Sequence, residues 1–226
     1  MPNMFITGAN RGIGLEFARQ YAAEGWNVHA ACRSPESAND LKALNGVTVH
    51  KLDVMDHAAI DRLAAELNIP FDVVIANAGV MGPRGDDQSF GTLNYGAWRE
   101  TMEVNVYGAV RTCEAFTPHL EQGDQKKMAV ITSKMGSIAD TSSGYTIYRT
   151  SKTALNMAMV AAAPVLAQKD IAVGIFHPGW VQTDMGGENA LISTEQCVKG
   201  LREQIEKTSP AEQPQFLTYA GDVVPW

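Results

Sequence analysis

Tyr148 and Lys152 are the residues whose types and spacing best suit chemistry. They stand four positions apart in a segment with helical periodicity, which places both side chains on one face of a helix. Reduction of a carbonyl group puts negative charge on its oxygen, so a proton donor must lie close by. A free tyrosine, with a pKa of about 10, is too weak an acid near neutral pH, but a neighbouring lysine ammonium stabilises its phenolate. The pair is therefore suited to exchanging a proton with a carbonyl or an alcohol.

The position of this pair matters more than its spacing, because an isolated Tyr-x-x-x-Lys is usually an exposed surface pair. Here it lies on the helix that follows the fifth predicted strand, where a ligand site is expected. Tyr145 is the alternative tyrosine, but Arg149 rather than a lysine stands four residues after it. We therefore assign Tyr145 to the wall of the pocket.

A glycine-rich loop, TGANRGIG, follows the first predicted strand and opens a helix. Gly8, Gly12 and Gly14 stand where the chain must turn tightly and let a pyrophosphate approach the backbone and the amino end of the helix. A glycine pattern alone is weak evidence for a nucleotide site. Its position between a strand and a helix at the start of the chain predicts a dinucleotide site.

The elements that must position these residues are short apolar runs that alternate with segments of helical period. The predicted strands are 3–6, 27–32, 47–52, 71–76, 128–132, 171–176 and 215–218. The predicted helices are 12–24, 38–44, 57–67, one after Tyr95, a long one from near Ile147, and 194–207. Apolar strands separated by helices are typical of a parallel sheet covered on both faces. We expect an α/β fold, a Rossmann-type doubly wound parallel sheet of about seven strands, with ligands beyond the carboxyl ends of the strands.

Composition narrows the range of partners. The 226 residues, of which 45% are hydrophobic, can bury one substantial core, so we expect a single domain over residues 1–226. A net charge of -7 without clustered Lys or Arg argues against a nucleic-acid partner. No secretory signal and no apolar stretch of about 20 residues is present, so we expect a cytoplasmic protein with no membrane partner. The scattered histidines and the three cysteines, Cys32, Cys113 and Cys197, predict no metal site.

The glycine spacing Gly-x-x-x-Gly-x-Gly resembles that of the classical short-chain dehydrogenase/reductase family. Four further matches follow in the expected order over nearly the whole chain: Asp53 in LDV, Asn77 to Gly79 as NAG, Tyr148 to Lys152 as YRTSK, and His177 to Thr183 as HPGWVQT. Within that family the chain looks most like the small reductases grouped with C-factor and sniffer-like carbonyl reductases. The resemblance implies a nicotinamide cofactor and assigns the proton exchange to Tyr148 and Lys152.

The resemblance also implies a role for each matching position. Asp53 and Val54 would face the adenine, Asn77 to Gly79 would lie beside the cofactor, and Pro178, Gly179 and Thr183 would orient the carboxamide. Asp53 could instead be a strand-end cap, and Gly79 and Gly179 could be turn residues. The full set of expected cofactor-binding residues is Gly8, Asn10, Arg11, Gly12, Ile13, Gly14, Arg33, Asp53, Val54, Asn77, Ala78, Gly79, Tyr148, Lys152, Pro178, Gly179, Val181 and Thr183.

Two further catalytic residues are expected from the resemblance, Ser133 and Asn105. Ser133 ends the fifth predicted strand, where its hydroxyl could hold the substrate oxygen. It precedes Tyr148 by 15 residues, and the usual shorter interval reaches Met135, which has no donor. We prefer Ser133 because the loop from 136 to 144 can absorb the excess, and Ser137 is the alternative. Asn105 matches the family position that holds a water linking Lys152 to solvent, although a helix-interior asparagine bonded to its own backbone is a rival interpretation.

The end of the second predicted strand indicates which dinucleotide is bound. An acidic residue there usually recognises the ribose 2′-hydroxyl of NAD, whereas a 2′-phosphate requires cationic donors. Cys32 stands where an NAD enzyme usually has aspartate, Arg33 follows it, and we expect Arg11 to project from the glycine loop toward the same region. This predicts NADP(H) in preference to NAD(H). Arg33 could instead be a solvated charge at a helix entry.

Together these features predict an NADPH-dependent carbonyl reductase, or the reverse alcohol dehydrogenase, for a small and apolar substrate. The rival of another class is a dinucleotide-binding regulator or signalling protein. A sugar-nucleotide epimerase or dehydratase needs a larger carboxyl-terminal region than the 43 residues after Thr183. The loops 81–94 and 186–192 are expected at the edges of the site, with apolar walls from Met81, Met135, Tyr145, Trp180 and Met185.

The resemblance also implies a homodimer or homotetramer. The helices around Tyr95 to His119 and Ile147 to Leu166 are the interface candidates. The second carries small residues that permit close helix approach but could equally pack on the sheet, namely Ala154, Ala158, Ala161, Ala162 and Ala163.

Overall fold

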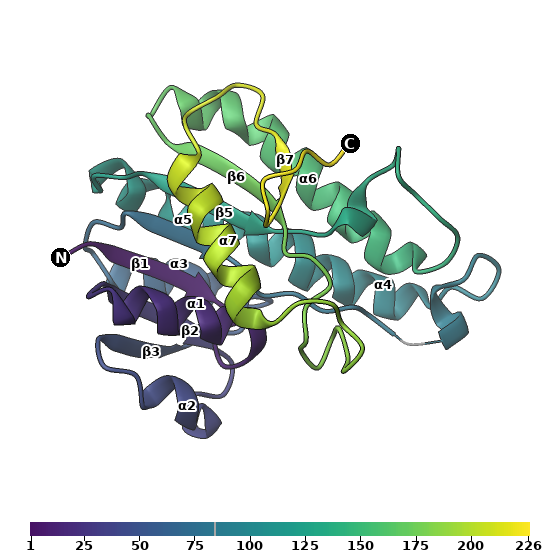
Figure 1. The fold of residues 1–226 in the computed structure, drawn as a ribbon, viewed down its shortest axis with the longest axis horizontal. Coiled ribbons are helices and arrows are strands. Elements are labelled where there is room, and N and C mark those ends of the chain that lie inside the picture. Colours follow the sequence, from purple (N-terminus) through teal and green to yellow (C-terminus); the bar gives the residue numbers. More distant parts are fainter. Residues whose placement is uncertain (84) are drawn as a thin grey trace.

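Seven parallel strands form one sheet in the computed structural model, which describes residues 1–83 and 85–226 (Figure 1). The strands lie in the order β3-β2-β1-β4-β5-β6-β7. Their bounds are β1 Asn3–Thr7, β2 Asn27–Cys32, β3 Val47–Lys51, β4 Val73–Ala76, β5 Lys127–Ile131, β6 Ala172–His177 and β7 Phe216–Thr218. The order reverses between β1 and β4, which is where ligands bind in doubly wound sheets. The predicted Rossmann-type fold is confirmed.

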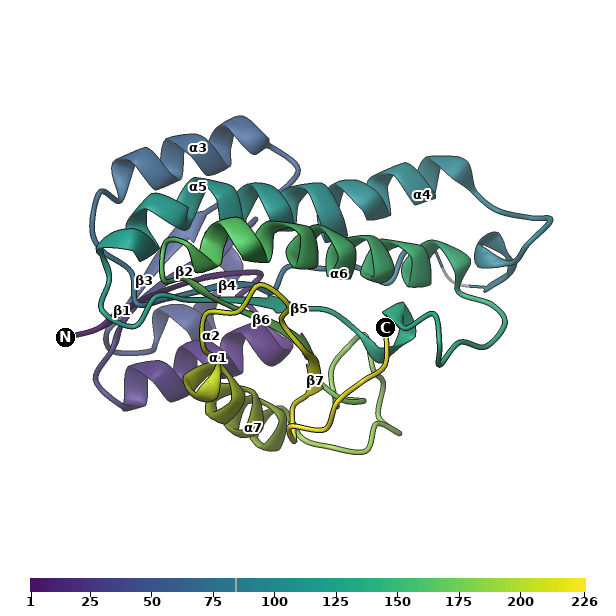
Figure 2. The same ribbon diagram turned by 90° about the horizontal axis from the view of Figure 1, so that it is seen from above.

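Helices cover both faces of the sheet (Figure 2). One face carries α3 (His57–Glu66), α4 (Tyr95–Met102), α5 (Ala109–Gln122) and α6 (Thr146–Ala167), and the other carries α1 (Gly12–Ala23), α2 (Asn39–Lys42) and α7 (Thr194–Lys207). Parallel neighbours require such crossover helices, because a tight turn cannot return the chain to the same end of the sheet. No helix in the described part of the chain is long and apolar enough to cross a membrane.

Two apolar cores lie on the two faces, because successive residues of a strand point to opposite sides. In β1, Phe5 packs against Phe71 and Phe116 beneath α5, whereas Met4 and Ile6 pack toward α1 and α7. The central strands are accordingly apolar throughout. The edge strand β3 departs from that prediction, because Thr48 and Lys51 are exposed.

The predicted elements are present, with differences at their ends and within one helix. The helix predicted over 38–44 is only four residues long. The predicted helix after Tyr95 is interrupted by a π-helical segment, η3 (Glu103–Gly108), which joins α4 to α5. The loops also contain short 3-10 helices, η1 (Pro35–Ser37), η2 (Gly85–Gln88) and η4 (Lys134–Gly136). Residue 84 of the predicted loop 81–94 lies outside the described residues.

Candidate active site

A cavity of about 500 Å³ lies beyond the carboxyl ends of the central strands. Nearly all of the predicted cofactor-binding residues line it: Gly8, Asn10, Arg11, Gly12, Ile13, Gly14, Arg33, Asp53, Val54, Asn77, Ala78, Gly79, Tyr148, Lys152, Pro178 and Thr183. Gly179 and Val181, the other two, are not among the lining residues and lie beside Pro178 and Thr183 in the chain. Ser133 and Asn105 are buried just behind the wall, with 8% and 0% of their surface exposed. The sequence therefore placed one contiguous site.

The glycine loop is shaped so that a ligand can approach its backbone. Gly8 and Gly12 adopt positive φ angles of 68° and 54°, a region that other residues rarely enter. A Cβ atom on Gly14 would lie 2.3 Å from the Gly8 carbonyl oxygen, and one on Gly8 would lie 2.8 Å from Ala78 Cα. The first residues of α1, Gly12 to Gly14, line the cavity, and the amino end of a helix suits a pyrophosphate.

Asn77 ties the end of β4 to the end of β1. Its Nδ2 donates to the carbonyl oxygens of Thr7 and Gly8 at 3.0 and 3.1 Å. The Thr7 hydroxyl in turn accepts from the backbone N–H groups of Asn77 and Ala78, at 3.2 Å each. These bonds fix the two strand ends on either side of the point where the strand order reverses, as the predicted supporting role requires.

Asn105 lies in the π-helical segment and is fully buried. Its Oδ1 accepts from the Val80 N–H at 2.8 Å, and its Nδ2 donates to the Val80 carbonyl at 2.8 Å and to Ser151 Oγ at 3.0 Å. The side chain thus binds a distant strand end and α6 rather than its own helix. A π-helical turn offers a physical reason for this, since the inserted residue changes where side chains point. The predicted water-holding role of Asn105 stays a prediction.

Lys152 is buried in the wall of the cavity, with 4% of its surface exposed. Its Nζ donates to the Ile131 carbonyl oxygen at 3.0 Å and lies 5.8 Å from the centre of the Tyr148 ring. Burial lowers the pKa of Lys152 to about 8, because a charged group loses hydration there. The ammonium is therefore available to a ligand in the cavity and is sensitive to pH near neutrality.

Tyr148 is almost as deeply buried, and burial raises the pKa of its phenol to about 12. The opposing influence is a hydrogen bond with the Ser133 side chain, which lowers that pKa. The sequence analysis assigned the lowering to Lys152, whereas in this structure Ser133 is the neighbour that provides it. The preference for Ser133 fits this contact, since its hydroxyl and the phenol face the same point.

The loop after Ser133 absorbs the long interval to Tyr148 and is fastened to α6. Thr153 Oγ1 donates to the Gly136 carbonyl at 2.9 Å, and Arg149 donates to Gly144 O at 3.0 Å and Ser142 Oγ at 2.7 Å. Ser137, the alternative serine, is 2% exposed, and its Oγ accepts from the Asp140 N–H at 3.0 Å. It therefore serves the loop itself.

Arg11 forms an ion pair with Asp184 in this structure, and its approach to the end of β2 stays a prediction. Its Nη1 lies 2.7 Å from Asp184 Oδ2, in the segment after β6, and both side chains are largely exposed. The segment comes this close because Thr183 packs on the glycine loop, where a Cβ on Gly12 would lie 3.2 Å from Thr183 Cγ2. Arg11 still lines the cavity, but as half of an ion pair.

The end of β2 matches the prediction more closely. Arg33 is exposed, and within the described residues no ion pair engages it. Cys32, the last residue of β2, is buried at the cavity wall. Asp53 combines its two interpretations, because it lines the cavity and its Oδ1 also accepts from the Met55 N–H at 3.0 Å.

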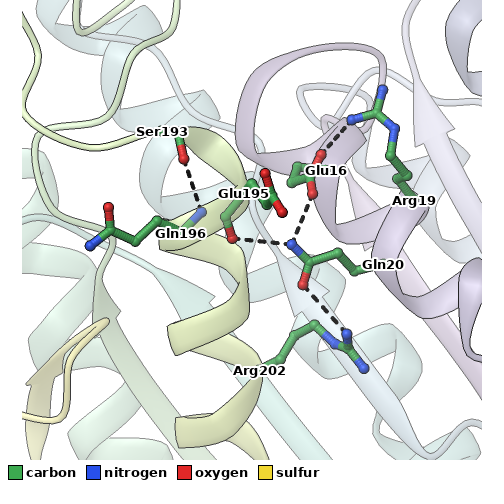
Figure 3. Close-up of polar contacts among 7 residues, drawn as sticks. All are labelled: Glu16, Arg19, Gln20, Ser193, Glu195, Gln196 and Arg202. Carbon is green, nitrogen blue, oxygen red and sulfur yellow. Dashed lines mark hydrogen bonds and ion pairs between the residues drawn. The ribbon is translucent and has the colours of Figure 1, made fainter.

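A polar network that the sequence did not reveal joins α1 to α7 (Figure 3). Glu16, 5% exposed, receives hydrogen bonds from Arg19 and from Gln20, the latter at 2.8 Å. Gln20 also donates to the Glu195 carbonyl at 3.1 Å and accepts from Arg202 at 3.4 Å. Such a buried carboxylate is stable only when paired. The network holds α1, which opens the cavity wall, against α7, which follows the 178–193 segment.

Of the five predicted apolar wall residues, Met185 lines the cavity, whereas Met81, Met135, Tyr145 and Trp180 are not among its described lining residues. Tyr145 is 50% exposed and begins α6 with a positive φ of 54°. Lining residues that the sequence analysis missed include Leu15, Arg19, Leu52, Val104, Ile131 and Gln182. Among the described residues, no cluster of three metal-ligating side chains occurs.

Comparison with known proteins gives a consistent picture. Residues 2–191 match the family model described as short chain dehydrogenase. C-signal of Myxococcus xanthus is 39% identical over 158 residues, which cover 70% of this chain and 93% of that protein. The 1-hydroxy-2-glutathionyl-2-methyl-3-butene dehydrogenase of Rhodococcus sp. (strain AD45) is 34% identical, and the match covers 100% of both chains.

Solved structures show the same architecture. A short-chain dehydrogenase/reductase of Burkholderia multivorans with bound NADP is 30% identical, with a TM-score of 0.91 over 100% of this chain and 99% of that one. An NADPH-bound carbonyl reductase from chicken fatty liver gives 28% identity and a TM-score of 0.91 over 100% and 99% of the two chains. The carbonyl reductase Sniffer of D. melanogaster gives 27% and 0.88 over 100% of both. The family model, the relatives and the site geometry agree, and this chain belongs to the short-chain dehydrogenase/reductase family.

Proposed function

We propose that this protein is an NADP(H)-dependent carbonyl reductase in which Tyr148 is the general acid. The observation that carries the proposal is the position of Tyr148 and Lys152, both buried, in the wall of the same cavity as the glycine loop. The glycine loop is suited to a dinucleotide, because it lines the cavity at the start of α1 and its tight packing on Ala78 and Asn77 leaves no room for side chains at Gly8 and Gly14. Relatives with bound NADP and NADPH support the choice of cofactor.

In this proposal the cofactor, when bound, supplies the hydride, and the chain's own residues manage the proton and the charge. Tyr148 donates its phenolic proton to the substrate oxygen, and the Ser133 hydroxyl holds that oxygen beside it. The Lys152 ammonium holds the cofactor ribose and lowers the pKa of the phenol once a ligand draws it from Ile131. Asn105 fixes the backbone of Val80 and the Ser151 hydroxyl next to this pair.

The proposed substrate is a small, apolar carbonyl compound, or the corresponding alcohol in the reverse direction. An apolar entrance is supported by Met185, which lines the cavity, and by two exposed apolar residues within six positions of it in the chain, Trp180 and Leu191. The relative named as a glutathionyl butene dehydrogenase makes a glutathione-conjugated alcohol a further candidate. A signalling or regulatory role is the second candidate, favoured by the relative named C-signal.

We further propose a homodimer or homotetramer formed through the α4–α5 and α6 helices. Tyr107, Met157 and Val165 are apolar and at least 49% exposed on these elements. Not all of the small residues of α6 are free to form this interface, because Ala163 is fully buried in the chain's own core. Sedimentation of the purified protein measures the assembly directly.

The experiment that tests the proposed reaction measures NADPH consumption with a panel of aldehydes, ketones and quinones, and NADP⁺ reduction with alcohols that include a glutathione conjugate. Tyr148→Phe removes one hydroxyl and should abolish turnover while NADPH binding stays near the wild-type value. Tyr145→Phe, three residues away at the start of the same helix and not in the cavity wall, is the matched control and should keep full activity. A wild-type protein that binds NADPH but turns over no compound of the panel would favour the regulatory candidate.

A further inference from the structure

Gln88 is a buried polar residue whose side chain bonds the backbone of Tyr148. It lies in η2, 1% exposed, and its Oε1 accepts from the Tyr148 N–H at 3.0 Å although the two residues are 60 positions apart. Its Nε2 donates to the Met81 carbonyl at 3.1 Å and to the Pro83 carbonyl at 2.6 Å. The first bond joins the loop after β4 to the first turn of α6, and the other two hold Gln88 in place within that loop.

The first turn of α6 lacks a cap of its own. The residue at the N-cap position, Tyr145, is in the left-handed region, and its side chain makes no capping hydrogen bond. The first four N–H groups of any helix have no partner within the helix, and a buried one without a partner is costly. Gln88 supplies the missing acceptor from a distant loop, at the N–H of the proposed catalytic residue itself.

A second buried amide completes the attachment. Asn105 bonds both the N–H and the carbonyl of Val80 and also contacts Ser151 on α6. Gln88 bonds the carbonyls of the next residue, Met81, and of Pro83. The segment 80–83 follows Gly79 of the cavity wall directly, so two amides attach it to the helix that carries Tyr148 and Lys152, one at the Tyr148 N–H and one at the Ser151 hydroxyl.

We propose that Gln88 is a positioning residue, which holds Tyr148 in register with the segment 80–83 and so couples the substrate-side loop 85–94 to the proton donor. The inference rests on the proposed function, because it assigns Tyr148 the role of acid. Gln88 does not touch the reacting atoms. Its effect is exerted through the backbone of Tyr148, whose phenol keeps its contact with Ser133 only while the first turn of α6 stays in place.

The test compares Gln88→Met, which keeps the size of the side chain and removes its hydrogen bonds, with Gln204→Met. Gln204 lies in α7 and is 9% exposed, so it matches Gln88 in burial but lies on the other face of the sheet. Gln88→Met should lower kcat about tenfold or more, the effect of a small misplacement of a reacting group, with an unchanged Kd for NADPH. Gln204→Met should leave kcat unchanged.

Gln88→Glu provides the rescue. A protonated glutamic acid can accept from the Tyr148 N–H and donate one bond to a carbonyl, whereas its carboxylate would face the two carbonyl oxygens without a donor. The variant should therefore approach wild-type kcat at about pH 5 and lose activity as the pH rises through the pKa of the new carboxyl group. The wild type and Gln204→Met should lack this additional titration.

Hydrogen exchange of the amides of residues 146–150 gives a readout that needs no turnover. Gln88→Met should exchange faster there than the wild type, and Gln204→Met should not. Wild-type kcat and an unchanged pH profile in Gln88→Met would overturn the positioning role, as would a fall in kcat that Gln88→Glu does not reverse at low pH. A wild type without turnover would refute the proposed function instead, whatever the exchange shows.

Discussion

Asn105 and Lys152 converge on the open face of Gly79. A Cβ atom at Gly79 would lie 3.3 Å from Asn105 Oδ1 and 3.4 Å from Lys152 Nζ. Contacts this short require a neighbour to move by a few tenths of an ångström, and both neighbours are buried. The glycine of the NAG motif therefore lets an amide and an ammonium approach the backbone at the cavity wall.

Gly79→Ala should consequently displace Lys152 or Asn105 while the fold is kept. We expect kcat to fall by about threefold to tenfold, with a smaller loss of NADPH affinity. Gly96→Ala is the matched control, because its Cβ would also lie 3.3 Å from an asparagine Oδ1, that of Asn94, but in α4. Steady-state kinetics of both variants decide the matter, and equal kcat values would show that the site tolerates the extra methyl group.

The lowered pKa of Lys152 predicts a pH dependence of cofactor binding. In the free protein this pKa is about 8, so the ammonium predominates well below pH 8 and is progressively lost as the pH rises through it. If the protonated form is the one that binds the cofactor, as the proposed function requires, the Kd for NADPH should rise above about pH 8, approaching tenfold per pH unit. The 2′-phosphate, with a second pKa of about 6, does not titrate in that range.

Fluorescence titration with NADPH between about pH 7 and pH 9.5 measures this rise of the Kd with pH. Lys152→Met should bind more weakly at neutral pH and show a flat profile. Lys169→Met, which removes an exposed lysine paired with Glu121, should show the same rise of the Kd with pH as the wild type. A rise of the Kd with pH that persists in Lys152→Met would come from another titrating group. The Lys152 ammonium would then have no part in NADPH binding.

The parts of the site that the sequence predicted are set by local structure. The glycine loop follows from a strand, a tight turn and a helix in immediate succession, and Tyr148 and Lys152 share a helix face because they are four residues apart. The role of Ser133 is implied by the family resemblance, and its place directly after a strand that ends on the ligand side selects it over Ser137. Each of these placements uses only neighbours along the chain.

The parts that were missed depend on the paths of distant loops. Gln88 bonds a residue 60 positions away, and Arg11 bonds one 173 positions away. Nothing in the local pattern around Arg11 tells whether its guanidinium turns to the end of β2 or to Asp184. The π-helical turn at Asn105 was likewise hidden, because one inserted residue barely disturbs an apolar helical pattern.

The variants Ser133→Ala and Ser137→Ala should differ clearly in their reaction rates. Ser133→Ala removes the hydroxyl that contacts the Tyr148 phenol, and the rate should fall by about 10²-fold, as it does when an oxyanion donor is lost. Ser137→Ala removes only an acceptor for the Asp140 N–H and should cost about 1 kcal/mol of folding stability with a near-normal rate. The rates and melting temperatures of the two variants check this, and the opposite ranking would move the serine role to Ser137.

Arg149 should control the loop that joins Ser133 to Tyr148. Its guanidinium donates to Gly144 O, Ser142 Oγ and, at 3.4 Å, Met135 O, which a single ammonium cannot reach together. We expect both Arg149→Ala and Arg149→Lys to lower kcat about tenfold with unchanged NADPH affinity.

Added guanidinium at millimolar concentration should restore part of the activity of Arg149→Ala and none of Arg149→Lys. Arg62→Ala is the control, since Arg62 is an exposed arginine whose partner in the structure is Asp56. Full activity of Arg149→Ala without guanidinium would show that the loop holds its shape without this side chain.

Cofactor choice should depend more on Arg33 than on Arg11, because the Arg11 guanidinium is already engaged by Asp184. A hydrogen bond to a charged group contributes about 1.5–3 kcal/mol, so Arg33→Ala should weaken NADPH binding roughly ten- to hundredfold and leave NADH almost unchanged. Arg11 must exchange a carboxylate for the phosphate, and exposed ion pairs contribute about 0–1 kcal/mol. Asp184→Asn should accordingly tighten NADPH binding by at most about fivefold, and only while Arg11 is present. The measurement is the dissociation constant of each cofactor, at one salt concentration, for the single variants and for Arg11→Ala combined with Asp184→Asn. A wild type that prefers NADH would refute the NADP(H) assignment. An equal gain in NADPH affinity from Asp184→Asn with and without Arg11 would mean that Asp184 acts on the phosphate directly.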